Sequence, residues 1–235
     1  AVQKLWDNIF MTTRVDQADP IAAWEAHDQQ LKAHRNFLNK ARFDRVHYKG
    51  PGTDLMVGLV KDHIWEGGSG FSAAGDRFFA NIPTEEVFSM PDADRVEGTL
   101  RATMPLSLRG QIVDDFHFTF KDGKVVDFDA GVGKQILADL LKMDEGATRL
   151  GEIALAQQHR RLFQSRNRYV TGIGSHAGGL NWPALRPEGT GSDDALPEVR
   201  LFLENSCAVN IAVLCSGEFV DQSGTRGIRA GEKTS

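Results

Sequence analysis

The chain has 235 residues, of which 41% are hydrophobic and 25% are charged, and its formal net charge is −5. This length allows one large domain or two small ones. The mild acidity argues against a nucleic-acid-binding surface, which is usually basic. The sequence has no apolar run long enough to cross a membrane, so no membrane span is expected. Cys207 and Cys215 fit neither a metal pair nor a disulfide framework, and a reducing, cytoplasmic setting is expected.

Two amphipathic helices are expected first. Apolar residues at helical spacing predict a helix over residues 2–12. Asp19 is a suitable N-cap for a second helix and Pro20 suits its first position. An apolar stripe carries this helix to about residue 41: Ile21, Trp24, Leu31 and Leu38. The charged residues between them are expected to face solvent, and His27 and His34 are expected to be ordinary helix residues rather than metal ligands.

Short strands are expected to follow. Alternating or continuous apolar runs predict strands over residues 45–48, 54–60, 63–65, 96–106 and 111–120. The Gly-Gly-Ser-Gly segment at 67–70 is interpreted as a turn, because it lacks the Gly-Lys-Ser/Thr ending of a phosphate-binding loop. An alternating aromatic row favours a core face over a binding platform: Phe116, Phe118 and Phe120. Asp122 and Gly123 suit a hairpin turn into a strand over 125–128.

The next part of the chain is expected to add a helix over 133–143, a short helix capped by Asp144, and a buried strand over 152–155. This order predicts an α+β fold, a β-rich mixed sheet domain with flanking helices, rather than regular βαβ alternation. Apolar periodicity is lost after Leu155. It returns in possible strands between 201 and 214, and the chain from Gly217 onward is expected to be loop.

Several segments resemble the aminopeptidase T / aminopeptidase S family of metallo-aminopeptidases. Two of them place glutamate beside apolar residues: Asn81–Phe88 and Gly151–Leu155. Others that share the resemblance are Thr12–Gln17, Asp19–Trp24, His47–Leu55, Phe118–Val126 and Asp144–Ala147. The resemblance ends near residue 155, and it implies a fragment of a larger two-domain metallopeptidase. Residues 1–155 are then expected to be a partial catalytic domain with its leading helices, and residues 156–235 an atypical tail that is divergent, frameshifted or disordered.

The resemblance implies two divalent metal ions, of zinc, cobalt or magnesium, which activate a water to hydrolyse the N-terminal peptide bond. Motif by motif, it carries over Glu86 and Glu152 as metal ligands, with Glu152 also catalytic in proton transfer. Glu86 is preferred to Glu85 because the second glutamate of the family motif is the ligand. Without the resemblance, both residues would be interpreted as surface glutamates at strand ends. Peptide substrates, a homodimer in the intact protein and a cytoplasmic location are further expectations.

The sequence also departs from the family. The later family segments that bring another glutamate, two histidines and a tyrosine are not matched after Leu155. The chain as it stands is therefore expected to be inactive. The alternative hypothesis is a non-catalytic β-rich binding or dimerisation module on the same scaffold. A serine hydrolase is disfavoured, because the sequence contains no Gly-x-Ser-x-Gly motif.

Overall fold

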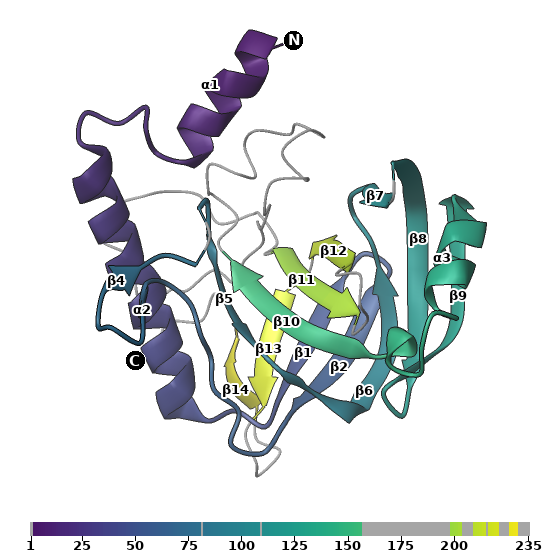
Figure 1. Ribbon diagram of the computed structural model, residues 1–235. Helices are drawn as coiled ribbons and strands as arrows, with labels where there is room; N and C mark the ends of the chain where they lie inside the picture. Colours follow the sequence, from purple (N-terminus) through teal and green to yellow (C-terminus); the bar gives the residue numbers. More distant parts are fainter. Residues whose placement is uncertain are drawn as a thin grey trace.

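The computed structural model describes residues 2–80, 82–108, 110–156, 198–203, 209–214, 216–220 and 226–229. Within these residues the chain forms two packed sheets, with helices at their sides (Figure 1). The predicted α+β fold is confirmed. The strand pairings among the described residues are antiparallel: β10 with β5 and β11, for example. In this part of the chain no helix is long and apolar enough to span a membrane.

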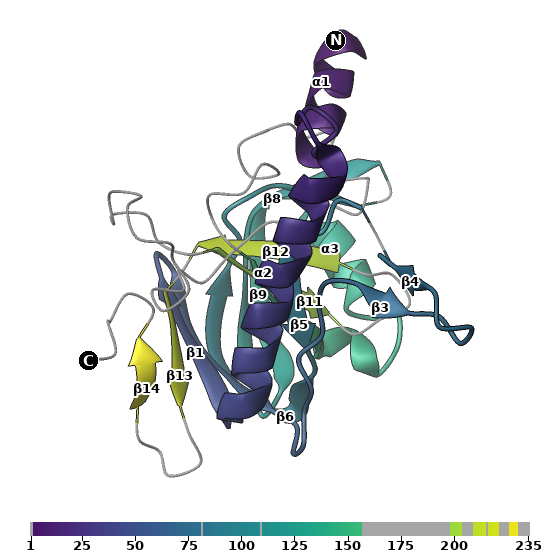
Figure 2. The same ribbon diagram turned by 90° about the vertical axis from the view of Figure 1, so that its left-hand side faces the viewer.

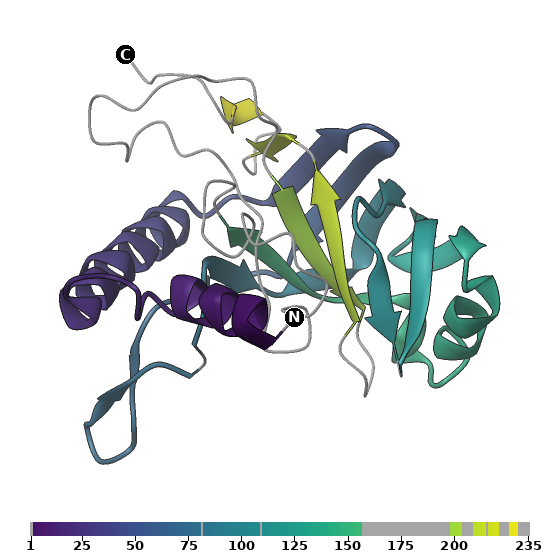
Figure 3. The ribbon, with the colours of Figure 1, turned by 90° about the horizontal axis from the view of Figure 1, so that it is seen from above.

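Both predicted N-terminal helices are present, as α1 (Val2–Thr12) and α2 (Pro20–Ala41). Asp19 caps α2 as expected, since its Oδ1 accepts a hydrogen bond of 2.9 Å from the backbone N–H of Ala22. The helix ends at Arg42, which adopts a left-handed conformation and donates its backbone N–H to the carbonyl of Leu38. Figures 1 and 3 show α1 and α2 on one side of the sheets and α3 (Lys134–Leu140) on the other.

Two expectations for α2 are wrong. Leu31 and Leu38 are buried as predicted, but Ile21 is 77% exposed. The supposed solvent face instead buries three polar residues: His27, Asp28 and His34. The reason is that α2 packs against β5 (Glu86–Ser89) and the segment leading into it, so a second side of the helix is covered.

The larger sheet contains most of the strands. Its order is β14 (Arg226–Arg229), β13 (Ser216–Val220), β1 (Arg45–Gly50), β2 (Thr53–Leu59), β6 (Pro91–Arg101), β8 (Gln111–Lys121) and β7 (Leu106–Leu108), and β9 (Lys124–Val132) pairs with β8. The smaller sheet has the order β12 (Val209–Leu214), β11 (Glu198–Leu203), β10 (Leu150–Ala156) and β5. A separate hairpin of β3 (Gly70–Phe71) and β4 (Arg77–Phe78) projects away from both sheets (Figures 2 and 3).

Several element boundaries differ from the predictions. The segment 63–65 is not a strand; Glu66 beside it makes a single bridge to Phe88. The helix after β9 is shorter than predicted, and a 3₁₀ turn (Gly146–Thr148) replaces the short helix expected after Asp144. The loop expected from Gly217 onward contains β13, which pairs with β1. The tail predictions for residues 157–197 lie outside the described residues.

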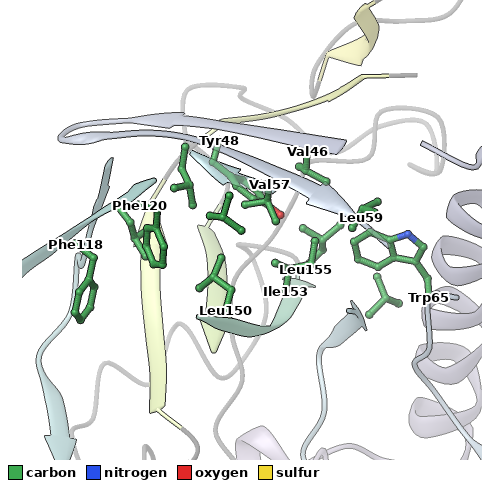
Figure 4. Close-up of a cluster of buried hydrophobic side chains, with 14 of the residues drawn as sticks. Val46, Tyr48, Val57, Leu59, Trp65, Phe118, Phe120, Leu150, Ile153 and Leu155 are labelled. Atoms are coloured by element: carbon green, nitrogen blue, oxygen red, sulfur yellow. The ribbon is translucent and has the colours of Figure 1, made fainter. Parts of the chain in front are cut away.

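The core lies between the two sheets. In Figure 4, Tyr48 and Val57 of the larger sheet face Ile153 and Leu155 of β10. The predicted aromatic row on β8 belongs to this core, since Phe116, Phe118 and Phe120 are at most 2% exposed. The core interpretation of that row is therefore confirmed.

Candidate metal centre

Glu86 and Glu152 lie on neighbouring strands of the smaller sheet. Strand β5 pairs with β10 so that Glu86 is opposite Ala156 and Ser89 is opposite Ile153. Because residues two apart along a strand share a face, Glu86 and Glu152 belong to the same face of this pair. Four residue steps separate Ala156 from Glu152, which is about 13 Å along the strand. The opposite face of both strands packs into the core: Val87, Ser89, Ile153 and Leu155.

The neighbouring glutamate, Glu85, forms an ion pair with Arg14. Oε1 of Glu85 accepts a hydrogen bond of 2.7 Å from Nη2 of Arg14, and both side chains are buried. Nε2 of His27 lies 3.6 Å from Oε2 of Glu85 and hydrogen-bonds the carbonyl oxygen of Thr84 at 2.7 Å. Glu85 is thus directed toward α2 and the turn before it. This geometry supports Glu86 as the glutamate of the pair that faces the Glu152 side.

The strand that carries Glu86 is held along both edges. On the edge away from β10, the backbones of Glu66 and Phe88 exchange two hydrogen bonds of 2.9 Å. Gly67 packs so closely that a Cβ added to it would lie 2.8 Å from the carbonyl oxygen of Glu86, and its φ of +153° also disfavours a side chain. The glycine-rich turn therefore serves to bring the chain against β5. Glu86 itself is buried, with only 5% of its surface exposed.

Burial raises the pKa of Glu152 to about 7. Desolvation disfavours the charged form of a carboxyl and accounts for this raised pKa without repulsion from Glu86. A carboxyl group with this pKa can hold or release a proton near neutral pH, which suits general acid–base chemistry. The predicted roles of Glu86 and Glu152 stay predictions.

The raised pKa of Glu152 has a consequence for stability. The pKa of Glu152 in the folded state exceeds its ordinary value of 4.5. This carboxyl therefore contributes stability that is fully present below about pH 4 and is lost as the pH rises through about 7. We expect Glu152→Gln to match the wild type in unfolding free energy near pH 4. Near pH 8.5 the variant should be more stable by on the order of 1 kcal/mol, once partial solvent screening is allowed for. Urea denaturation at both pH values tests this, and a variant of equal stability at high pH would contradict it.

The described residues do not make up a complete metal site. Carboxylate oxygens are suitable ligands for hard divalent cations. In the described part of the chain, however, no group of three or more His, Cys, Asp or Glu residues could hold a metal ion. Of the two helix histidines, His27 bonds to a backbone carbonyl rather than facing Glu86. The tail histidines, His159 and His176, lie outside the described residues.

Comparison with known proteins places the chain in a family. The family described as thermophilic metalloprotease (M29) matches residues 1–170. The chain belongs to this M29 family. It is 52% identical over 155 residues to aminopeptidase T of Thermus aquaticus and 50% identical over 155 residues to aminopeptidase 2 of Geobacillus stearothermophilus. Each alignment covers 66% of this chain and 38% of the relative.

A solved M29 relative has the same fold. The structure described as wild-type AmpT from Thermus thermophilus matches 100% of this chain and 59% of that chain, with a TM-score of 0.77 and 31% sequence identity. In the sequence alignments with the curated relatives, by contrast, the chain spans about 38% of the length of each relative. The predicted family resemblance is confirmed.

Sequence reasoning missed the residues that surround Glu85. Arg14 and Glu85 are 71 positions apart, and no local pattern links a residue between two helices to a residue before a short strand. The sequence predicts His27 only as an ordinary helix residue and gives no sign of its burial, yet it is 3% exposed and contacts the Thr84 carbonyl. Both contacts depend on how α2 packs against β5, which periodicity does not specify.

Proposed function

We propose that the chain carries part of the catalytic domain of a metallo-aminopeptidase, an enzyme that hydrolyses the N-terminal peptide bond of peptides. Membership of the M29 family supports the reaction class. The observation that carries the site assignment is the placement of Glu86 and Glu152 on one face of the β5–β10 pair. Peptide substrates, a homodimer of the intact protein and a cytoplasmic location belong to the same proposal.

In this proposal Glu86 and Glu152 supply oxygen ligands. Two bound divalent ions, of zinc, cobalt or magnesium, would lower the pKa of a water and stabilise negative charge on the scissile carbonyl. Glu152 is also assigned proton transfer in this proposal. Its pKa of about 7 belongs to the metal-free carboxyl, and bound divalent ions would lower that pKa and favour the carboxylate form that serves as a ligand. Glu86 remains fixed because its strand is held on both edges.

We also propose that residues 1–155 form the partial catalytic domain and that this chain, by itself, has no aminopeptidase activity. Each divalent ion needs about four or more ligands. Glu86 and Glu152 leave most of these positions to water, and the later motifs expected to bring the remaining ligands are not matched in the sequence.

The full chain is therefore expected to release no N-terminal residue from a leucine anilide in the presence of zinc, cobalt or magnesium. The measurement is the absorbance of the released aniline, with a full-length M29 aminopeptidase as the positive control. Metal-dependent release that disappears in Glu86→Gln would contradict the proposed inactivity while supporting the metal site. If manganese(II) fails to bind at Glu86 in solution, the alternative of a non-catalytic binding module is favoured.

A further inference from the structure

A buried ion pair lies directly beside Glu86. The side chain of Glu85 is 0% exposed and that of Arg14 is 7% exposed, and the two groups meet at 2.7 Å. The guanidinium of Arg14 lies over the ring of Trp24, 4.8 Å from its centroid. Trp24 in turn donates from its Nε1 to the carbonyl oxygen of Thr13 at 2.8 Å. Arg14 is therefore fixed by the turn between α1 and α2 before it reaches Glu85.

The segment before Glu86 makes a second contact with α2, through its backbone. His27 donates from Nε2 to the carbonyl oxygen of Thr84 at 2.7 Å, and both His27 and Thr84 are buried. The residue before Glu86 is thus held through its side chain, and the carbonyl one residue earlier is held through its oxygen. Helix α2 and the turn before it provide both contacts.

An ion pair is a costly way to attach a helix to a strand. Two charges removed from water lose much of their solvation, and apolar side chains of similar volume often give equal or greater stability. What an arginine–carboxylate pair adds is direction, because a planar guanidinium and a carboxylate bond only in particular geometries. The Arg14–Glu85 pair is therefore suited to fixing the orientation of Glu85, the residue directly before Glu86.

We propose that Arg14 and His27 are positioning residues for Glu86. They fix Glu85 toward α2, so that the alternation of side chains along the extended chain turns Glu86 to the face shared with Glu152. The inference rests on the proposed function, since it concerns the orientation of a proposed metal ligand. Neither residue touches the metal; both act through Glu85 and the Thr84 carbonyl.

Manganese(II) is a suitable probe for the test, because it accepts carboxylate ligands and broadens the NMR signals of nearby nuclei. The full chain is titrated with manganese(II), and broadening is followed at the backbone amides of residues 86 and 152. The double variant Arg14→Met/Glu85→Leu replaces the ion pair by apolar groups and is expected to fold. We expect it to need about tenfold more manganese for the same broadening, as when a supporting contact of a metal ligand is lost.

Two further comparisons separate positioning from a merely structural role. Leu38→Ala weakens the packing of the same helix at a fully buried position without touching Glu85, and its titration should match the wild type. His27→Leu removes the hydrogen bond to Thr84 and should weaken binding. His27→Gln retains an amide donor and should restore binding. Should the double variant fail to fold, Arg14→Lys, which keeps the charge but loses the planar fork, takes its place with the same expectation.

The outcomes distinguish the two proposals. Broadening that persists unchanged in Glu86→Gln would overturn the proposed metal site and this inference with it. Broadening that is lost in Glu86→Gln but unchanged in the Arg14 and His27 variants would overturn the positioning role alone. Weaker binding in Leu38→Ala, to the same extent as in the double variant, would show that the ion pair acts only through stability.

Discussion

Replacing Phe118 with alanine is expected to lower the free energy of unfolding by about 3–5 kcal/mol. The ring is 0% exposed and lies among three other aromatic rings. Its centroid is 5.8 Å from that of Phe116, 6.3 Å from that of Phe120 and 6.5 Å from that of Phe128. Truncation removes this buried apolar area and leaves a cavity that the two flanking strands, β6 and β9, cannot close without losing their pairing with β8.

The measurement is denaturant unfolding followed by circular dichroism. Phe71→Ala is the matched control, because the same side chain is 69% exposed on the projecting hairpin. Its effect should stay within about 0.5 kcal/mol. Similar losses at both positions would mean that the aromatic row contributes no more than a surface residue. Such a result would reopen the interpretation of this row as a binding platform.

The local part of the fold is readable from the sequence because local rules decide it. The cap of α2 depends on Asp19 and Pro20 alone, and both perform their predicted roles. The hairpin between β8 and β9 depends on Asp122 and Gly123. Their φ values are 49° and 77°, and this left-handed backbone conformation favours aspartate and glycine. Alternation along β8 likewise assigns its aromatic residues to the core.

Nonlocal packing accounts for the errors. Nothing near His27 or Asp28 shows that a second side of α2 will be covered, because the covering segments come 40 or more residues later. The missed strand β13 pairs with β1, more than 160 residues earlier in the chain, so its short apolar content gives little local signal. In both places the burial of a side chain depends on which distant segment packs against it, and local periodicity does not identify that segment.

The candidate site depends partly on sequence motifs and partly on nonlocal packing. Its two glutamates could be selected through the family resemblance, but their separation depends on the register between β5 and β10. A one-residue change of that register would move Glu86 to the other face relative to Glu152. The choice between Glu85 and Glu86 gains independent support from the Arg14 contact, which the sequence does not reveal.

Asp28 connects α2 to the base of the projecting hairpin. Its Oδ1 accepts a hydrogen bond of 2.6 Å from the backbone N–H of Ser69. Its Oδ2 receives the Ser69 hydroxyl at 2.9 Å, Nζ of Lys32 at 2.8 Å and Nη2 of Arg77 at 2.8 Å. Burial opposes ionisation of this carboxyl, but the hydrogen bonds from Lys32 and Ser69, with the charge of Lys32, outweigh it and lower the pKa to about 2.

The lowered pKa predicts how stability depends on pH. Because the folded state favours the ionised form, the contribution of Asp28 is fully present above the ordinary pKa of 3.8 and is lost as the pH falls through about 2. We expect Asp28→Asn to lower the unfolding free energy by about 2–3 kcal/mol at neutral pH, since the amide replaces a charge that both Lys32 and Arg77 contact. Near pH 2 the difference between wild type and variant should shrink to the part due to hydrogen bonding alone.

Denaturant unfolding between about pH 7 and pH 2 measures this difference, over the range in which the carboxyl titrates. Asp76→Asn makes the same chemical change in the exposed loop of the β3–β4 hairpin, so it separates the buried network from a general effect of removing one negative charge. A difference that stays constant with pH would show that ionised Asp28 does not stabilise the fold. An equal loss in Asp76→Asn would assign the effect to net charge. A loss confined to Asp28→Asn and fading below about pH 4 would show that the ionised carboxyl attaches the hairpin to α2.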